Sequence, residues 1–199
     1  MSRITARLAA TGAAVVLAVT AASGVSVADT TATATAASGQ AVITADLNFL
    51  TDAALNGILV VPLQPADPNA DPATGLTVTL PVTGGAANIP SFYGHVEFGG
   101  GLLFLNLRTG KSVTFKQLDF TVARGYFTAV PNGSDTPVPL LDPRGSNVIS
   151  RTGTTQYLKS SSFQVDPAGA NYLDTNLGTS YFTGGQQIGS LALTFTPAS

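Results

Sequence analysis

Tyr93, His95 and Glu97 alternate along one stretch of the chain, and their side chains could bind a ligand or a metal ion. In a β-strand, residues two apart point to the same face, so a phenol, an imidazole and a carboxylate would stand in one row, with Phe92 and Val96 on the opposite face. His95 is the only histidine, so any histidine base must be built on it. The same alternation also predicts a plain solvated face of a half-buried strand, and this interpretation stays beside the ligand site.

Catalytic alternatives depend on a few acids. No G-x-S-x-G elbow supplies a nucleophile. A secreted hydrolase would use Asp119 or Glu97, the chain's only glutamate, and would need a raised pKa for that carboxyl group in a cleft. Other acids, such as Asp142, Asp166 and Asp174, mostly fall at predicted turns or helix starts, where Asp has structural roles. The sequence therefore leaves a hydrolase only as an alternative.

The metal-ligand inventory is small. With no Cys and one His, the usual zinc sites are almost excluded. Asp67, Asn69 and Asp71 match the first ligand positions of a calcium-binding loop. The match then fails, because Pro72 stands where the loop needs a glycine and Val78 stands where it needs a glutamate that binds calcium through both oxygens. These three residues are weak calcium candidates, and a proline-punctuated loop explains them as well.

Charge argues against nucleic acid as a partner. The chain has 9 Lys and Arg against 11 Asp and Glu, for a formal net charge of −2. Nucleic-acid binding proteins neutralise several phosphates with clustered basic side chains, whereas the basic residues of this chain are scattered. The remaining partners are a small-molecule ligand or a component of the cell envelope.

The N-terminus resembles an export signal. Arg3 and Arg7 precede an apolar stretch over 8–19, and Ser26-Val27-Ala28 offers a small-x-small cleavage site. The stretch is shorter than the ~20 strongly apolar residues of a membrane span, so we expect cleavage rather than an uncleaved anchor. The prediction is a signal peptide over 1–28 and a secreted or extracellular protein, either free or associated with the cell surface.

Two further segments follow this signal. Residues 29–40 contain no large apolar side chain and are predicted to be a flexible, Ala- and Thr-rich linker. Residues 41–199 are long enough to form one core without disulfides, which the absence of Cys requires. The expected organisation is therefore one β-rich domain behind a linker.

Low charge and alternating hydrophobicity predict an all-β fold, either an antiparallel β-sandwich or a barrel-like meander, with one or two short helices. We expect a first strand from Ala41 to Phe49, a helical turn over 52–56 capped by Thr51, and a strand over 58–63. A loop over 64–75 would precede an edge strand over 76–82 that contains Pro81. The later expectations are a hairpin around 99–101, a bulge near Gln117, a helix from Asp166 to Gly178 and a closing strand over 191–195.

One stretch carries a resemblance to a known family. The sequence Phe-Tyr-Gly-His-Val-Glu-Phe-Gly-Gly-Gly-Leu over 92–102, with Val-Pro-Leu-Leu-Asp-Pro over 138–143, resembles the core of HtaA-type domains. Those are β-rich, exported haem-uptake modules of high-GC Gram-positive bacteria, and the similarity covers roughly residues 76–145. The resemblance implies a β-rich fold and haem as a candidate cofactor.

The resemblance carries over no ligand residue. The family's N-terminal segment, with its Trp and its haem-ligating Tyr, has no counterpart here, and His95 precedes the glycine run that the family's His follows. Tyr93 or another exposed tyrosine could still serve as an axial ligand, because tyrosinate binds ferric haem.

The residues together favour an exported, non-catalytic extracellular or cell-envelope β-domain, structural or ligand-binding. An HtaA-like haem-binding protein is the first alternative and a secreted hydrolase is the second. Carbohydrate binding would need an aromatic platform, for which the material is Tyr126, Phe127, Tyr157, Tyr172 and Tyr181.

Overall fold

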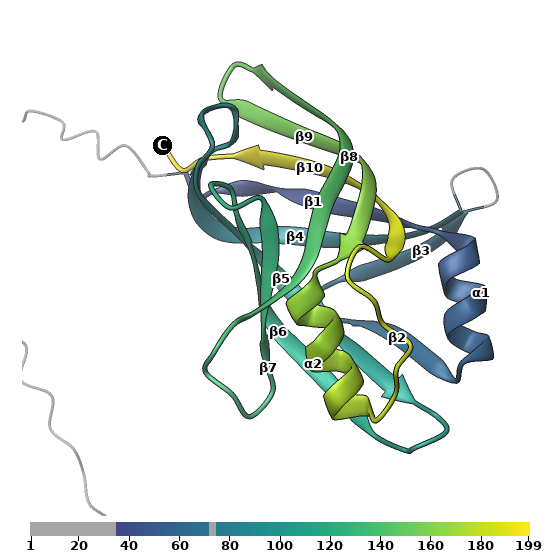
Figure 1. Cartoon of the computed structure of the whole chain (residues 1–199). Helices are drawn as coiled ribbons and strands as arrows, with labels where there is room; N and C mark the ends of the chain where they lie inside the picture. The colour runs from purple at the N-terminus through teal and green to yellow at the C-terminus, as the bar shows by residue number, and fades with distance from the viewer. Residues whose placement is uncertain (1–34, 72–74) are drawn as a thin grey trace, which may run out of the picture. The chain divides into compact units, whose positions relative to one another are not determined.

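The computed structural model describes residues 35–71 and 75–199, so the predicted signal peptide and residues 29–34 of the predicted linker lie outside the described residues. The described chain is antiparallel β-structure with two α-helices and one 3-10 helix (Figure 1). The strands are β1 (Ser38–Ala45), β2 (Ile58–Leu63), β3 (Asp67–Asp71), β4 (Gly75–Asn88), β5 (Tyr93–Asn106), β6 (Ser112–Thr121), β7 (Tyr126–Pro131), β8 (Val138–Thr152), β9 (Thr155–Val165) and β10 (Gln187–Thr196). The helices are α1 (Leu47–Leu55), η1 (Ile89–Ser91) and α2 (Pro167–Leu177).

Eight of these strands close into a barrel, which confirms the all-β, barrel-like prediction. The order of hydrogen-bonded neighbours is β5-β6-β7-β8-β9-β10-β1-β4, and pairing of β4 with β5 closes the ring. Barrels of about this size enclose either a packed core or one small ligand. The interior of this barrel therefore matters for function as well as for stability.

The barrel opens where β4 and β5 part. The first half of β5, Tyr93–Phe98, pairs with β4, but the second half, Gly101–Asn106, pairs with β2. The first part of β4 pairs in turn with β3. Strands β2 and β3 extend the sheet beyond the closed ring, lie at the two ends of the sheet order and share no ladder, so the backbone hydrogen bonding of the barrel wall has a gap between them.

The glycines of 99–101 do not form the predicted hairpin. They lie inside the continuous strand β5, at the point where its partner changes from β4 to β2 and its register with β6 shifts. Gly100 has a φ of 96°, and a Cβ there would lie 2.8 Å from the Ala66 nitrogen and the Leu63 oxygen. The glycine run thus bends a strand rather than reversing it.

The prediction that Pro81 marks an edge strand is also wrong. β4 pairs with three strands, but its ladder with β3 ends at Thr79 and its ladder with β5 begins at Val82. Pro81 falls between these two ladders and pairs only with Gln40 of β1. A proline is tolerated here because one side of the strand has no partner at this residue.

Two local boundaries differ from expectation. Strand β1 ends at Ala45 and α1 begins at Leu47, because Asp46 caps the helix by accepting a hydrogen bond from the Asn48 nitrogen at 2.8 Å. The predicted cap, Thr51, instead bonds to the Leu47 carbonyl. Strand β1 also begins at Ser38, inside the predicted linker.

The segment predicted as a loop over 64–75 contains strand β3, and every residue of β3 is exposed to solvent.

Helix α2 agrees with the prediction of a helix from Asp166 to Gly178. Asp166 caps its start and Gly178, with a φ of 63°, ends it. α2 packs against β8 and β6 across one end of the barrel, whereas α1 lies beside β2 (Figure 1). No helix of the described residues is long and apolar enough to cross a membrane.

Candidate functional site

The predicted row of Tyr93, His95 and Glu97 lies on the outer face of β5. His95 and Glu97 are about half exposed, Tyr93 is 73% exposed, and Val96 between them is fully buried. The alternation is therefore confirmed for this strand. Phe92 departs from it, since it ends η1 in a left-handed conformation and is exposed.

The sheet register extends this polar row over two more strands. Glu97 of β5 pairs with Asp119 of β6, and Asp119 pairs with Thr128 of β7. One step along, His95 pairs with Thr121. The His95 Nε2 lies 3.4 Å from the Glu97 Oε1, so these side chains form a weak contact on the sheet surface. The sequence named Asp119 and Glu97 separately, but only the register brings them together.

Glu97, Asp119, Thr121 and Thr128 line a groove of about 910 Å³ on the outer face of β5, β6 and β7. Its volume lies within the range of about 300–1,000 Å³ that is usual for ligand sites. The lining residues are Thr83, Glu97, Phe98, Gln117, Leu118, Asp119, Thr121, Arg124, Tyr126, Thr128, Val130, Pro137 and Pro139. Tyr93 and His95 do not line the groove, so Glu97 is the one residue of the predicted row that does.

The predicted bulge at Gln117 is present and shapes the groove. Gln117 has a φ of 51°, and the pairing of β6 with β7 shifts register between Lys116 and Asp119. A bulge increases the local twist and re-aims side chains. It places Gln117 and Asp119 together in the lining of the groove.

Asp119 is the half-buried acid of the groove. Burial raises the pKa of its carboxyl group above the ordinary value, and the negative charge of Glu97 adds to the rise. The charge of His95 and a hydrogen bond that the Thr121 hydroxyl donates at 3.2 Å oppose it. Desolvation is the largest of these effects.

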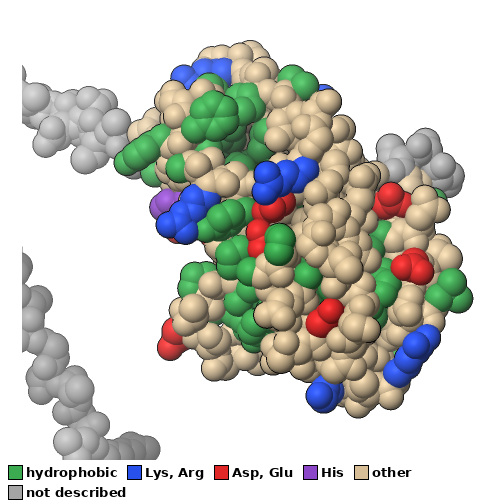
Figure 2. Space-filling model, viewed as in Figure 1, with side chains coloured by type: hydrophobic (Ala, Val, Ile, Leu, Met, Phe, Trp, Pro, Cys, Tyr) green, Lys and Arg blue, Asp and Glu red, His purple; other side chains and the backbone are tan. Residues whose placement is uncertain are grey.

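Arg124 and Tyr126 also line the groove. The Arg124 guanidinium donates a hydrogen bond to the Tyr126 hydroxyl at 2.7 Å, and its carbon lies 6.0 Å from the centre of the ring. The contact orients the tyrosine ring at the surface of β7. In Figure 2 the histidine, drawn in purple, lies at the left margin of the coloured part of the molecule, beside a basic side chain.

The weak calcium candidates Asp67, Asn69 and Asp71 lie on strand β3. Asp67 and Asp71 are four residues apart, about 13 Å along an extended strand, whereas two oxygens bound to one calcium ion at about 2.3–2.6 Å lie at most about 5 Å from each other. An extended strand therefore does not wrap these side chains around one ion. Among the described residues, no three His, Asp or Glu side chains gather into a group that could hold a metal.

A second cavity, of about 270 Å³, lies at the gap in the barrel wall. Every described residue that lines it is apolar: Ile43, Ala45, Phe49, Leu50, Val60, Pro62, Pro68, Leu76, Val78, Leu102, Phe104, Leu141, Val165, Leu173, Phe182 and Ile188. The sequence did not indicate this cavity, because its walls come from segments that each look like ordinary core.

Neither the apolar cavity nor the exposed face that carries Tyr93 and His95 offers haem a ligand at the mouth of an apolar slot. Ferric haem would need an apolar slot with a tyrosinate or imidazole at its mouth, and neither Tyr nor His lines the apolar cavity. Tyr181 packs against Phe49 nearby, but burial and the neighbouring Asp52 raise the pKa of its phenol to about 12, which opposes tyrosinate formation. Tyr93 and His95 stand on an exposed strand face without an apolar slot.

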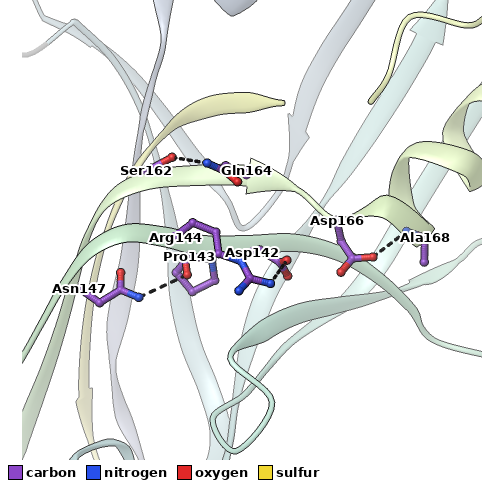
Figure 3. Close-up of polar contacts among 8 residues, drawn as sticks. All are labelled: Asp142, Pro143, Arg144, Asn147, Ser162, Gln164, Asp166 and Ala168. Atoms are coloured by element: carbon purple, nitrogen blue, oxygen red, sulfur yellow. Dashed lines mark hydrogen bonds and ion pairs between the residues drawn. The ribbon is translucent and has the colours of Figure 1, made fainter. Parts of the chain in front are cut away.

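A buried acid, Asp142, lies outside both sites. Its Oδ2 accepts a hydrogen bond from the Arg144 guanidinium at 2.8 Å, and its buried Oδ1 has no partner. Figure 3 shows the Asp142 carboxyl between Arg144 and Asp166, the N-cap of α2. Burial raises the pKa of Asp142, and the nearby Asp166 raises it further against the opposing effect of Arg144.

No protein-family model and no curated protein matches the sequence. The fold, a closed barrel with two helices, is nevertheless that of an HtaA-like β-domain. It is similar to the crystal structure of the C-terminal domain of HtaA from Corynebacterium glutamicum, with a TM-score of 0.57. The match covers 83% of this chain and 99% of that chain at 11% identity. The resemblance read from the sequence is thus confirmed at the level of the fold.

Proposed function

We propose that this protein is an exported, non-catalytic β-domain of the cell envelope or the extracellular space that binds a small polyhydroxylated ligand, such as an envelope glycan, in the outer groove. The observation that carries the proposal is the groove of about 910 Å³ on β5, β6 and β7. Its acids, hydroxyls and one oriented tyrosine come from three adjacent strands of a rigid sheet.

The chemistry of the groove suits hydroxyl groups. Glu97 and Asp119 accept hydrogen bonds when ionised, and Thr121 and Thr128 both donate and accept them. The Tyr126 ring, held by Arg124, offers an apolar face with a polar edge. A ligand that presents several hydroxyls around an apolar ring face would use all of these groups.

Export is supported by the sequence. The predicted signal peptide ends at Ala28, before strand β1 begins at Ser38. The absence of Cys is compatible with either redox compartment, because this barrel closes through its own hydrogen-bond ladders.

Binding can be tested by titrating the full-length ¹⁵N-labelled protein with maltotriose, cellotriose and chitotriose. We expect amide shifts confined to β5–β7 for at least one trisaccharide, and at least tenfold weaker binding by Tyr126→Ala. Tyr93→Ala is the matched control, because Tyr93 is an exposed tyrosine outside the groove. Absence of shifts with all three sugars, or an equal loss in both variants, would reject the glycan site.

Export can be tested separately in a Gram-positive expression host. N-terminal sequencing of protein from the culture medium or the cell wall is expected to begin at Asp29. Ala28→Asp should block this cleavage, since the site requires a small residue. Wild-type protein that stays in the cytoplasm would contradict the proposal.

A hydrolase is the second candidate, and Asp119 favours it. A carboxyl group with raised pKa beside a second carboxylate in a groove is the arrangement that acid–base hydrolysis requires. Chromatography of the same trisaccharides after long incubation separates the two functions. Intact sugars support the non-catalytic domain, whereas cleavage that is lost in Asp119→Asn without loss of binding supports the hydrolase.

A further inference from the structure

The apolar cavity inside the barrel differs from the groove in the chemistry that it can accept. Its wall comes from both sides of the gap, with Val60 of β2 facing it from one side and Val78 of β4 from the other. Leu102 and Phe104, on the second half of β5, line it from within the barrel. None of these side chains offers a hydrogen bond, so a polar ligand would lose its bonds to water and gain none.

The volume sets the size of the occupant. An apolar cavity of about 150 Å³ stays dry and binds benzene, a ligand of six carbons. By proportion, about 270 Å³ accommodates roughly ten carbons. The cavity is too small for a macrocycle, and its volume equals that of a single aliphatic chain of this length.

The composition of the lining bears on the head group. No described residue that lines the cavity is Lys or Arg, and none has a polar side chain. A carboxylate head drawn into the cavity would therefore lose its water and find no cation in the described lining, whereas an uncharged head has no charge to desolvate.

From these observations we infer that the cavity between β2 and β3 binds an aliphatic chain of about ten carbons that carries an uncharged head group. The gap in the barrel wall, which neither β2 nor β3 closes, is the entrance. The inference is independent of the glycan groove, because the two sites share no lining residue.

Two neighbouring valines provide a matched test. Val60 lines the cavity, whereas Val61 of the same strand is 41% exposed and lies outside it. Val60→Phe fills the cavity, and Val61→Phe adds the same atoms on the outer face. The probe is 1-decanol, with decanoate as the charged comparison, added to the full-length protein and followed by calorimetric titration and thermal unfolding.

Wild type and Val61→Phe are expected to bind 1-decanol and to unfold at higher temperature in its presence, with decanoate at least tenfold weaker. Val60→Phe should lose both effects. Val78→Phe fills the same space from the opposite wall and replaces Val60→Phe if that variant does not fold. Failure of wild type to bind 1-decanol, or retained binding in a folded cavity-filling variant, would overturn the proposal. If Val61→Phe lost 1-decanol binding as completely as Val60→Phe, the proposal would also be overturned. The binding surface would then be the outer apolar face of β2 or a contact with a second copy of the chain.

Discussion

The two halves of β5 serve opposite purposes. The first half, Tyr93–Phe98, closes the barrel with β4 and presents Glu97 to the outer groove. The second half, Gly101–Asn106, leaves β4 for β2 and presents Leu102 and Phe104 to the apolar cavity. One strand therefore builds a polar site by sheet register and an apolar site by a change of partner. The glycine run between the halves separates the two chemistries.

The largest effect is expected at the junction itself. Gly100→Ala should lower the free energy of unfolding by about 3 kcal/mol, because Gly100 has a positive φ and a Cβ there would meet the backbone of Leu63 and Ala66. Gly110→Ala is the control. It has a similar positive φ but open space around a Cβ, so it should cost only about 1 kcal/mol. Urea unfolding compares them, and equal losses would show that the junction is not tightly packed.

The next effect contrasts the two halves directly. Leu102→Ala should cost about 2–3 kcal/mol, since it removes buried methyl groups and enlarges the apolar cavity that Leu102 lines. His95→Ala, on the exposed face of the first half, should stay within about 0.5 kcal/mol. Thermal and urea unfolding measure both. A small cost for Leu102→Ala would mean that the cavity wall contributes little to the core.

A smaller effect on stability is expected at Asp142, a buried acid on β8 that belongs to neither half of β5. Its pKa is raised in the folded state, so the folded protein holds the proton to higher pH than the unfolded chain does. Stability should therefore fall as pH rises from about 3.8 through the raised pKa and remain lower above it. Asp142→Asn carries no charge and should remove this fall, becoming more stable than wild type near pH 7 by about 1 kcal/mol. A pH series of unfolding curves that stays parallel for the two proteins would contradict this.

Much of the fold was predictable from local patterns, and the site was predictable only in part. Alternation indicated an all-β protein, Asp166 and Gly178 marked α2, and Gln117 marked the bulge. Each of these signals acts within a few residues of the chain. By contrast, Gly99–Gly101 and Pro81 were misinterpreted, because their roles depend on which strands lie beside them.

The same limit explains the two sites. Glu97 and Asp119 were each candidates, but their pairing depends on the register between β5 and β6. Phe49 was assigned to a strand, yet it lies on α1 and lines the apolar cavity. A cavity has no residue signature of its own, because its lining is composed like a packed core and only the gap between β2 and β3 distinguishes it.

The smallest effect in energy is the most informative about the groove. A carbon-detected NMR titration of Asp119 should give a midpoint above the ordinary value of 3.8, because desolvation outweighs the opposing contacts. Thr121→Val removes a hydrogen bond that favours the ionised carboxyl, and His95→Ala removes a favourable charge, so both should move the midpoint upward. Because Asp119 is only half-buried, the accompanying change in stability should stay below about 1 kcal/mol. A midpoint that His95→Ala does not move would mean that β5 and β6 do not couple their polar side chains, and the groove would then be a solvated sheet face like any other.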